Sequence, residues 1–166
     1  MNIETPPTEK PYEKPEGERR GLIIVNTGNG KGKSTAAFGL AFRATGRGKA
    51  VKVYQFMKVP TARFGEHRLA EQVGLPIEGL GDGFSWKSKD LDHSAQLARD
   101  GCILSGWLPL QEVLDTLKAR PKDVHVCLTG RRCPQEIIDI ADTVTEMTLI
   151  KHAFQAGIPA QRGIED

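Results

Sequence analysis

A glycine- and lysine-rich loop at residues 27–35 (TGNGKGKST) constrains the fold of this chain more than any other part of its sequence. The loop follows a short apolar run at residues 22–25, which is typical of a strand buried on both faces. From Lys33 onward, alanine and leucine recur at helical spacing, and Gly46 and Gly48 are stop signals. The order strand, loop, helix predicts an α/β fold with the loop at the edge of its sheet.

The composition of the loop favours binding of an anion. Its glycines allow consecutive backbone N–H groups to turn toward one ligand, and the following helix N-terminus adds partial positive charge. The Lys33 side chain is placed to reach phosphate oxygens, and the Ser34 hydroxyl is placed to ligate a magnesium ion. We therefore predict a site for a nucleotide triphosphate. The candidate binding residues in the loop are Gly28, Asn29, Gly30, Lys31, Gly32, Lys33, Ser34 and Thr35.

The loop departs from the general pattern G-x-x-x-x-G-K-[ST], because Thr27 occupies the position of the first glycine and Gly28 is displaced by one. An alternative interpretation is a surface turn that happens to be rich in glycine and lysine. The preceding apolar strand and the following helix favour the binding loop. The Lys31 side chain either helps to hold phosphate or is a solvated loop lysine.

The rest of the chain alternates between short apolar runs and helical patterns. Strands are expected at 51–57, 124–128 and 144–150, and helices at 110–117 and 134–141. This alternation predicts a parallel sheet with helices on both faces. Between Gly65 and Gly106 the glycines break up any long element, so no element is assigned there. Residues 1–20 hold four prolines and are interpreted as a flexible N-terminal arm to a single domain at 21–166.

Composition excludes several classes of protein. The net charge of +2 is too small to indicate a nucleic-acid partner, and the basic residues form no long stripe. No apolar run approaches the roughly 20 residues that span a bilayer, and no signal-peptide pattern is present. Cys102, Cys127 and Cys133 lack the spacing of a zinc site or a disulfide framework. We expect a cytoplasmic protein.

In its offset form, the loop closely resembles that of the bacterial ATP:corrinoid adenosyltransferases, which act on cob(I)alamin or cob(I)yrinic acid a,c-diamide. Other segments resemble the same family in the same order along the chain. They are VYQFMK at 53–58, GFSW at 83–86, TGR at 129–131 and KHAFQAGI at 151–158. The resemblance covers most of residues 20–166.

This resemblance implies a P-loop NTPase-like (RecA-like) fold and transfer of the 5′-deoxyadenosyl group of ATP to cobalt(I) of a reduced corrinoid, as in adenosylcobalamin biosynthesis. Lys33 and Mg²⁺ (or Mn²⁺) would stabilise the departing triphosphate. Phe84 and Trp86 would lie beside the corrin ring, although without the resemblance core packing is the simpler interpretation. The family also implies a homodimer and a flavoprotein reductant.

Arg131 directly follows a predicted strand, where open parallel sheets place ligand contacts, and its guanidinium suits a phosphate. The alternative is a solvated arginine.

One departure from the family concerns the metal. Its members carry an apolar strand ending in Asp-Glu that organises magnesium, whereas this chain runs from Leu91 through Gly106 directly into Trp107 at the start of the next helix. The fold is thus expected to lack one family strand, through a natural deletion, an incompletely assembled sequence or a sheet that closes differently. The alternative function is a catalytically impaired protein that binds nucleotide and corrinoid. A kinase or motor NTPase is not favoured, because no acidic metal-binding strand is found.

Overall fold

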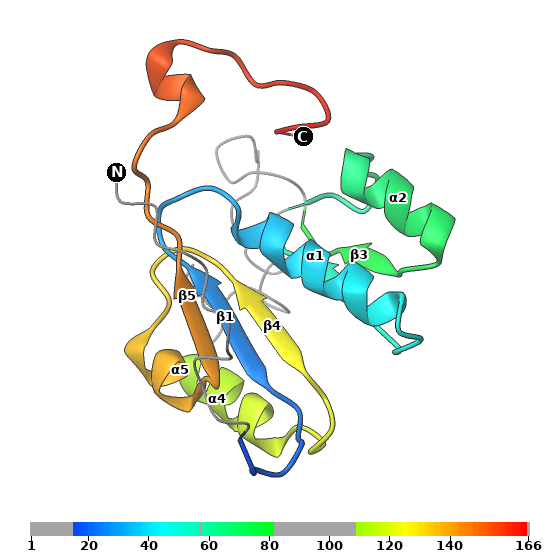
Figure 1. The fold of residues 1–166 in the computed structure, drawn as a ribbon, viewed down its shortest axis with the longest axis vertical. Coiled ribbons are helices and arrows are strands. Elements are labelled where there is room, and N and C mark those ends of the chain that lie inside the picture. The colour runs from blue at the N-terminus through cyan, green and yellow to red at the C-terminus, as the bar shows by residue number, and fades with distance from the viewer. Residues whose placement is uncertain (1–14, 57, 82–108, 166) are drawn as a thin grey trace, which may run out of the picture.

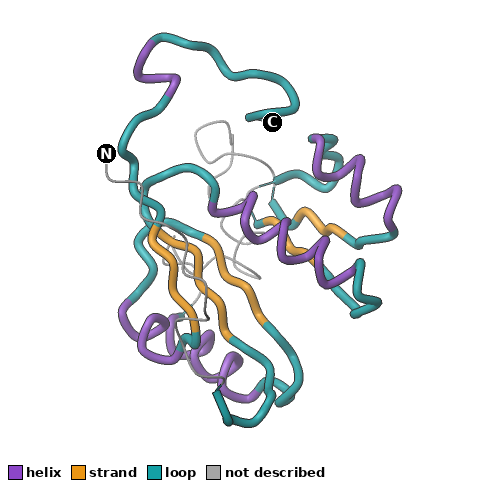
Figure 2. The backbone as a smooth tube through the Cα atoms, viewed as in Figure 1, coloured by secondary structure: helices purple, strands orange, loops and turns teal. Residues whose placement is uncertain are grey.

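The computed structural model describes residues 15–56, 58–81 and 109–165. Helices and strands alternate along the chain, as the sequence predicts (Figure 1). In order they are β1 (Ile23–Thr27), α1 (Lys33–Thr45), β2 (Val53–Gln55), α2 (Gly65–Val73), β3 (Ile77–Gly79), α4 (Leu110–Ala119), β4 (Val126–Thr129), α5 (Gln135–Ile140), β5 (Thr143–Glu146) and the 3₁₀ helix η2 (Ala153–Ala156). Figure 2 shows the same path by type of secondary structure.

The larger sheet has three parallel strands in the order β4-β1-β5. In the middle strand, Val25 lies opposite Leu128 of β4 and Val144 of β5, and its side chain is 1% exposed. Helices α4 and α5 supply the apolar side chains that pack on Ile23 and Val25. The buried members from these helices are Val113, Leu114, Leu117 and Ile137. The expected α/β fold with parallel strands and interleaved helices is confirmed.

A second, smaller sheet consists of β2 and β3, which also pair in parallel. Helix α1 lies between the two sheets in Figure 1. It contacts β1 and β4, and its Ala41 and Phe42 also pack in an apolar cluster with Ala70 of α2 and Leu75. Within residues 15–56, 58–81 and 109–165, the outer edge of β4 has no strand partner. Helix α1 is therefore a packing link between the two sheets.

Two elements in the segment that the sequence left unassigned are present in the structure. Helix α2 spans Gly65–Val73 and strand β3 spans Ile77–Gly79. Gly74, which the sequence suggests as a breaker, caps the end of α2 with φ of 68°. This left-handed conformation is the usual role of a glycine after a helix, so Gly74 marked a boundary rather than the absence of a helix.

The prediction of a strand at 144–150 is wrong at its carboxyl end, because β5 ends at Glu146. Met147 instead accepts a hydrogen bond from Gly30 at 2.6 Å, and Ile150 is 92% exposed. The strand expected at 51–57 is likewise shorter, since the part of β2 that pairs is Val53–Gln55. Apolar residues can continue the sequence pattern past the last residue that pairs with a neighbouring strand, so the strand ends before the pattern does.

No helix in the described part of the chain is long and apolar enough to cross a bilayer.

The carboxylate of Asp142 ties the start of β1 to the start of β5. It accepts a hydrogen bond from the backbone N–H of Ile23 at 2.8 Å and is ion-paired with Arg20. The Arg20 guanidinium, with the Ile23 N–H, lowers the pKa of Asp142 from 3.8 to about 2. The ionised carboxylate therefore stabilises the amino-terminal edge of the sheet.

We predict that Asp142→Ala lowers the free energy of unfolding by about 1 kcal/mol at pH 7, because the Ile23 N–H loses its acceptor. Since the folded pKa of about 2 lies below the ordinary 3.8, this stabilisation is present above about pH 4 and is lost as the pH falls toward 2. Urea titrations between pH 2 and 7 measure the difference between the two proteins. A difference that stays constant down to pH 2 would contradict the assignment, and Asp142→Asn, which keeps an oxygen acceptor, is the matched control.

Candidate functional site

Three loops meet at one edge of the larger sheet, because β1, β4 and β5 are parallel and their carboxyl ends lie together. Open parallel sheets bind ligands at this edge. A cavity of about 520 Å³ opens there. It is lined by Asn29, Gly30, Lys31, Gly32, Lys33, Ser34 and Thr35 of the glycine-rich loop and by Arg131, Leu149, His152, Phe154, Gln155 and Glu165. Seven of the eight candidate residues from the loop thus line one cavity, together with Arg131.

The glycine-rich loop packs against the backbone that follows β5. Gly30 donates from its N–H to the Met147 carbonyl oxygen at 2.6 Å, and Met147 donates to the Thr27 carbonyl oxygen at 2.9 Å. A Cβ atom at Gly30 would lie 2.6 Å from the Met147 oxygen. Gly28, the remaining loop candidate, is equally close to this segment. These two glycines are required by close packing of backbones, which adds a structural reason to the one inferred from sequence.

Helix α1 begins directly after Gly32, whose φ of 110° is in the left-handed region that favours glycine. No side chain forms a capping hydrogen bond with the start of this helix. Its first N–H groups, from Lys33 onward, therefore remain for solvent or a ligand, and the helix dipole adds positive potential there. Ser34 and Thr35 are exposed in this first turn.

Two cationic side chains lie close together in the cavity. The Lys33 ammonium donates a hydrogen bond to the Gly30 carbonyl oxygen within the loop. Burial lowers the pKa of Lys33, and the positive charge of Arg131 lowers it further. Like charges held near each other favour an anion between them. The arrangement therefore suits a polyanionic group such as a phosphate chain.

Arg131 reaches this position because its loop is tied to β1. The Gly130 N–H donates to the Asn26 carbonyl oxygen, and the Cys133 N–H donates to the Thr27 hydroxyl, both at 3.2 Å. Thr27 is buried and contacts the two segments beside the glycine-rich loop. Its hydroxyl accepts from Cys133, and its carbonyl oxygen accepts from Met147. The sequence showed Thr27 as a departure from the motif, but it gave no sign of this long-range hydrogen bond.

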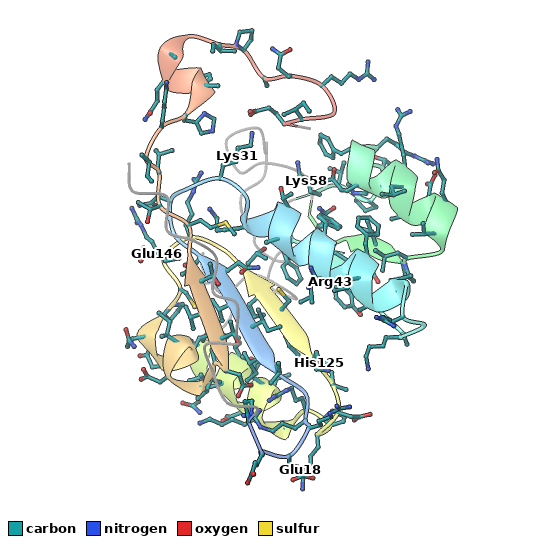
Figure 3. All side chains as sticks on the ribbon, in the orientation of Figure 1. Glu18, Lys31, Arg43, Lys58, His125 and Glu146 are labelled. Atoms are coloured by element: carbon teal, nitrogen blue, oxygen red, sulfur yellow. The ribbon has the colours of Figure 1, made fainter. Side chains whose placement is uncertain are left out.

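A C-terminal segment forms the outer wall of the cavity. His152 accepts a hydrogen bond at Nδ1 from the Phe154 N–H at 3.1 Å, and Phe154 is 78% exposed. Lys31 is ion-paired with Glu165 of this segment. Figure 3 shows Lys31 extending from the loop on the side of the C-terminal segment. The sequence carries no local signal for a contact between residues so far apart.

The remaining predicted site residues fall into two groups. Asn29, Ser34 and Thr35 line the cavity with exposed polar side chains. Phe84 and Trp86 lie outside the described residues. No group of three or more His, Cys, Asp or Glu side chains that suits a metal ion occurs in the described part of the chain.

Comparison with known proteins identifies close relatives. A sequence model of the family ATP:corrinoid adenosyltransferase BtuR/CobO/CobP matches residues 19–105 and 101–165. The corrinoid adenosyltransferase CobA of Salmonella typhimurium is 42% identical over 171 residues, covering 89% of this chain and 87% of the relative. Corrinoid adenosyltransferases of Escherichia coli K12 and Pseudomonas aeruginosa are 40% and 41% identical over 89% of this chain, covering 87% and 85% of the relatives.

The alignment with the Salmonella protein is longer than the part of this chain that it covers. About 148 residues of this chain (89% of 166) are spread over 171 aligned positions of the Salmonella protein, so about 23 positions have no counterpart here. The family match divides into two stretches that meet at residues 101–105. This division agrees with the expectation that a segment is missing shortly before Trp107.

We predict that Gly30→Ala destabilises the loop by about 1–3 kcal/mol, because the new methyl group must displace the Met147 backbone. Binding of Mg·ATP, measured by calorimetry, should weaken at least several-fold. Gly39→Ala on α1 is the matched control, since nothing lies within 4 Å of its Cβ position. Removal of a helix glycine should leave binding unchanged and stabilise the fold by about 0.5–1 kcal/mol. Equal effects of the two substitutions on binding would contradict the packing role of Gly30.

We also predict that Thr27→Val weakens Mg·ATP binding several-fold and costs about 1–3 kcal/mol of stability, because the Cys133 N–H loses its acceptor and the Arg131 loop is released. Thr27→Ser keeps the hydroxyl and should retain most of the Mg·ATP affinity and most of the stability. If valine and serine give the same affinity, the hydroxyl does not position Arg131.

Proposed function

The chain belongs to the ATP:corrinoid adenosyltransferase family, and we propose that it transfers the 5′-deoxyadenosyl group of ATP to the cobalt of a reduced corrinoid. In this proposal residues 27–35 are a phosphate loop of the P-loop NTPase type. The observation that carries it is the convergence of Lys33, Arg131 and the uncapped start of α1 on one cavity. All three supply positive charge at the carboxyl edge of a parallel sheet.

The reaction requires charge stabilisation more than acid–base chemistry. The cobalt(I) electron pair forms a bond to the ribose C5′, and the C5′–O bond breaks with its electrons going to inorganic triphosphate. Negative charge therefore grows on the bridging oxygen of the leaving group. Lys33, Arg131 and the loop N–H groups are suited to stabilise this charge, because hydrogen bonds to charged groups are the strongest ones a site can offer.

A metal ion would add to this stabilisation. Mg²⁺ prefers oxygen ligands and usually keeps several waters while binding substrate phosphates. Ser34 supplies one exposed hydroxyl in the first turn of α1, and Glu165 is the single carboxylate among the described residues that line the cavity. This donor set fits an ion that arrives with ATP. We propose Ser34 as its protein ligand.

Several finer points of the proposal come from the family resemblance. Phe84 and Trp86 are proposed to face the corrin ring and exclude water from the cobalt. A homodimer, a flavoprotein reductant and a cytoplasmic location are proposed as well. Residues 1–20 are proposed as an N-terminal arm, which joins the catalytic domain at Arg20 through its ion pair with Asp142.

The direct test is anaerobic incubation of the protein with ATP, Mg²⁺ and chemically reduced cobalamin. The proposal predicts the absorption spectrum of an adenosylated corrin together with one inorganic triphosphate for each adenosyl group transferred. The absence of any spectral change under strict anaerobiosis would contradict it.

We predict that Lys33→Ala weakens Mg·ATP binding at least about 10-fold, since a hydrogen bond to a charged group contributes about 1.5–3 kcal/mol and 1.4 kcal/mol corresponds to a factor of ten. The same change should lower the adenosylation rate at saturating ATP, because Lys33 acts on the leaving group. Lys49→Ala, an exposed lysine after α1, is the control for loss of charge. Equal Mg·ATP affinities of Lys33→Ala and Lys49→Ala would show that Lys33 does not bind phosphate.

A second candidate function is favoured by the internal gap of about 23 aligned positions. A protein without the acidic strand of the family would bind ATP and corrinoid but turn over slowly, because a carboxylate that positions the metal is worth several kcal/mol in such reactions. It predicts saturable binding of both substrates with no triphosphate released. Stoichiometric triphosphate would rule this candidate out.

A further inference from the structure

The ion pair between Lys31 and Glu165 brings the C-terminal segment onto the loop that we propose for phosphate binding. The Glu165 side chain is 23% exposed and that of Lys31 is 46% exposed. Both residues line the same cavity as Lys33 and Arg131. A carboxylate thus lies in a cavity whose other charged groups are cations, with His152 also on its wall.

The backbone before Glu165 forms a closed turn. The N–H groups of Ile164 and Glu165 both donate to the Gln161 carbonyl oxygen, at 3.1 and 2.8 Å. Gly163 has φ of 78°, a conformation that glycine adopts readily. The turn presents the carboxylate to Lys31 without help from a packed core, because its apolar neighbour Ile164 is 80% exposed. A segment held by so few buried contacts can leave at little cost.

The neighbouring side chains set the charge state of the Glu165 carboxylate. Its pKa is lowered, first by the hydrogen bond from Lys31, and the charges of Lys31 and His152 lower it further. The carboxylate is therefore ionised at neutral pH and carries the same sign of charge as a phosphate oxygen.

We propose that Lys31 and His152 form an anion subsite at the outer edge of the loop, which the Glu165 carboxylate fills in the free protein and a phosphate oxygen of ATP takes over on binding. This inference rests on the proposed function, because it requires ATP to bind at residues 27–35. Triphosphate displaces the carboxylate because it also contacts Lys33, Arg131 and the start of α1. After transfer, Glu165 competes with inorganic triphosphate for Lys31 and so promotes release of the product.

The test compares Mg·ATP dissociation constants of the full chain with Glu165→Gln, Lys31→Met and the double variant. Loss of a surface ion pair has a small effect, so Glu165→Gln should tighten ATP binding about 1.4–5-fold. In the Lys31→Met background, Glu165→Gln should leave the Mg·ATP affinity unchanged, because the carboxylate affects ATP binding by occupying Lys31. Inorganic triphosphate should show the same pattern.

The matched control is Glu78→Gln, which removes a second Lys–Glu ion pair, between Lys52 and Glu78, far along the chain from the loop. It should leave ATP affinity unchanged. Glu165→Ala is a second variant that should change affinity in the same direction as Glu165→Gln.

Unchanged or weaker ATP binding by both Glu165 variants would overturn the subsite. Equal tightening with and without Lys31 would also overturn it, because the carboxylate would then act by general repulsion. If the unsubstituted chain binds ATP but forms no adenosylated corrin, the proposed function fails while the pattern of affinities still decides the subsite. Absence of ATP binding by the unsubstituted chain would contradict both.

Discussion

The parallel pairing of β1 with β4 on one side and β5 on the other is the constraint from which the site follows. Because the three carboxyl ends share one edge, the glycine-rich loop, the Arg131 loop and the segment after β5 are adjacent there. Thr27 then connects all three, since its hydroxyl accepts from Cys133 and its carbonyl accepts from Met147. The cations are thus positioned by backbone geometry and a few hydrogen bonds.

The sequence predicts the part of this arrangement that is local. An apolar run, a glycine-rich loop and a helical pattern are contiguous, so β1, the loop and α1 could be placed within a few residues. Arg131 could be placed because it follows a strand. The ion pair of Lys31 with Glu165 joins residues distant in sequence and leaves no periodic pattern. Helix α2 was missed because Gly74 and the glycines after it were interpreted as breakers, whereas Gly74 is the C-cap of the helix.

The described residues form two separate parallel sheets. Among the residues that the structure describes, β4 and β2 each pair with a strand on one edge, and α1 packs against both sheets. The Salmonella relative carries about 23 aligned positions that this chain lacks, and the family match divides at residues 101–105. Those residues follow β3 and precede α4 in the chain. The two stretches of the family match thus meet outside the described residues, whereas the first of them includes β1, the loop and α1.

The central claim is that the loop at 27–35 holds the triphosphate of ATP with Lys33 and Arg131. A crystal structure of the protein with ATP and Mg²⁺ measures this most directly. In this complex we expect the Lys33 ammonium to have left the Gly30 carbonyl oxygen and to lie within about 3 Å of a phosphate oxygen, as should N–H groups of the first turn of α1. Nucleotide bound elsewhere, or a Lys33 ammonium still bonded to Gly30 beside bound ATP, would contradict the account.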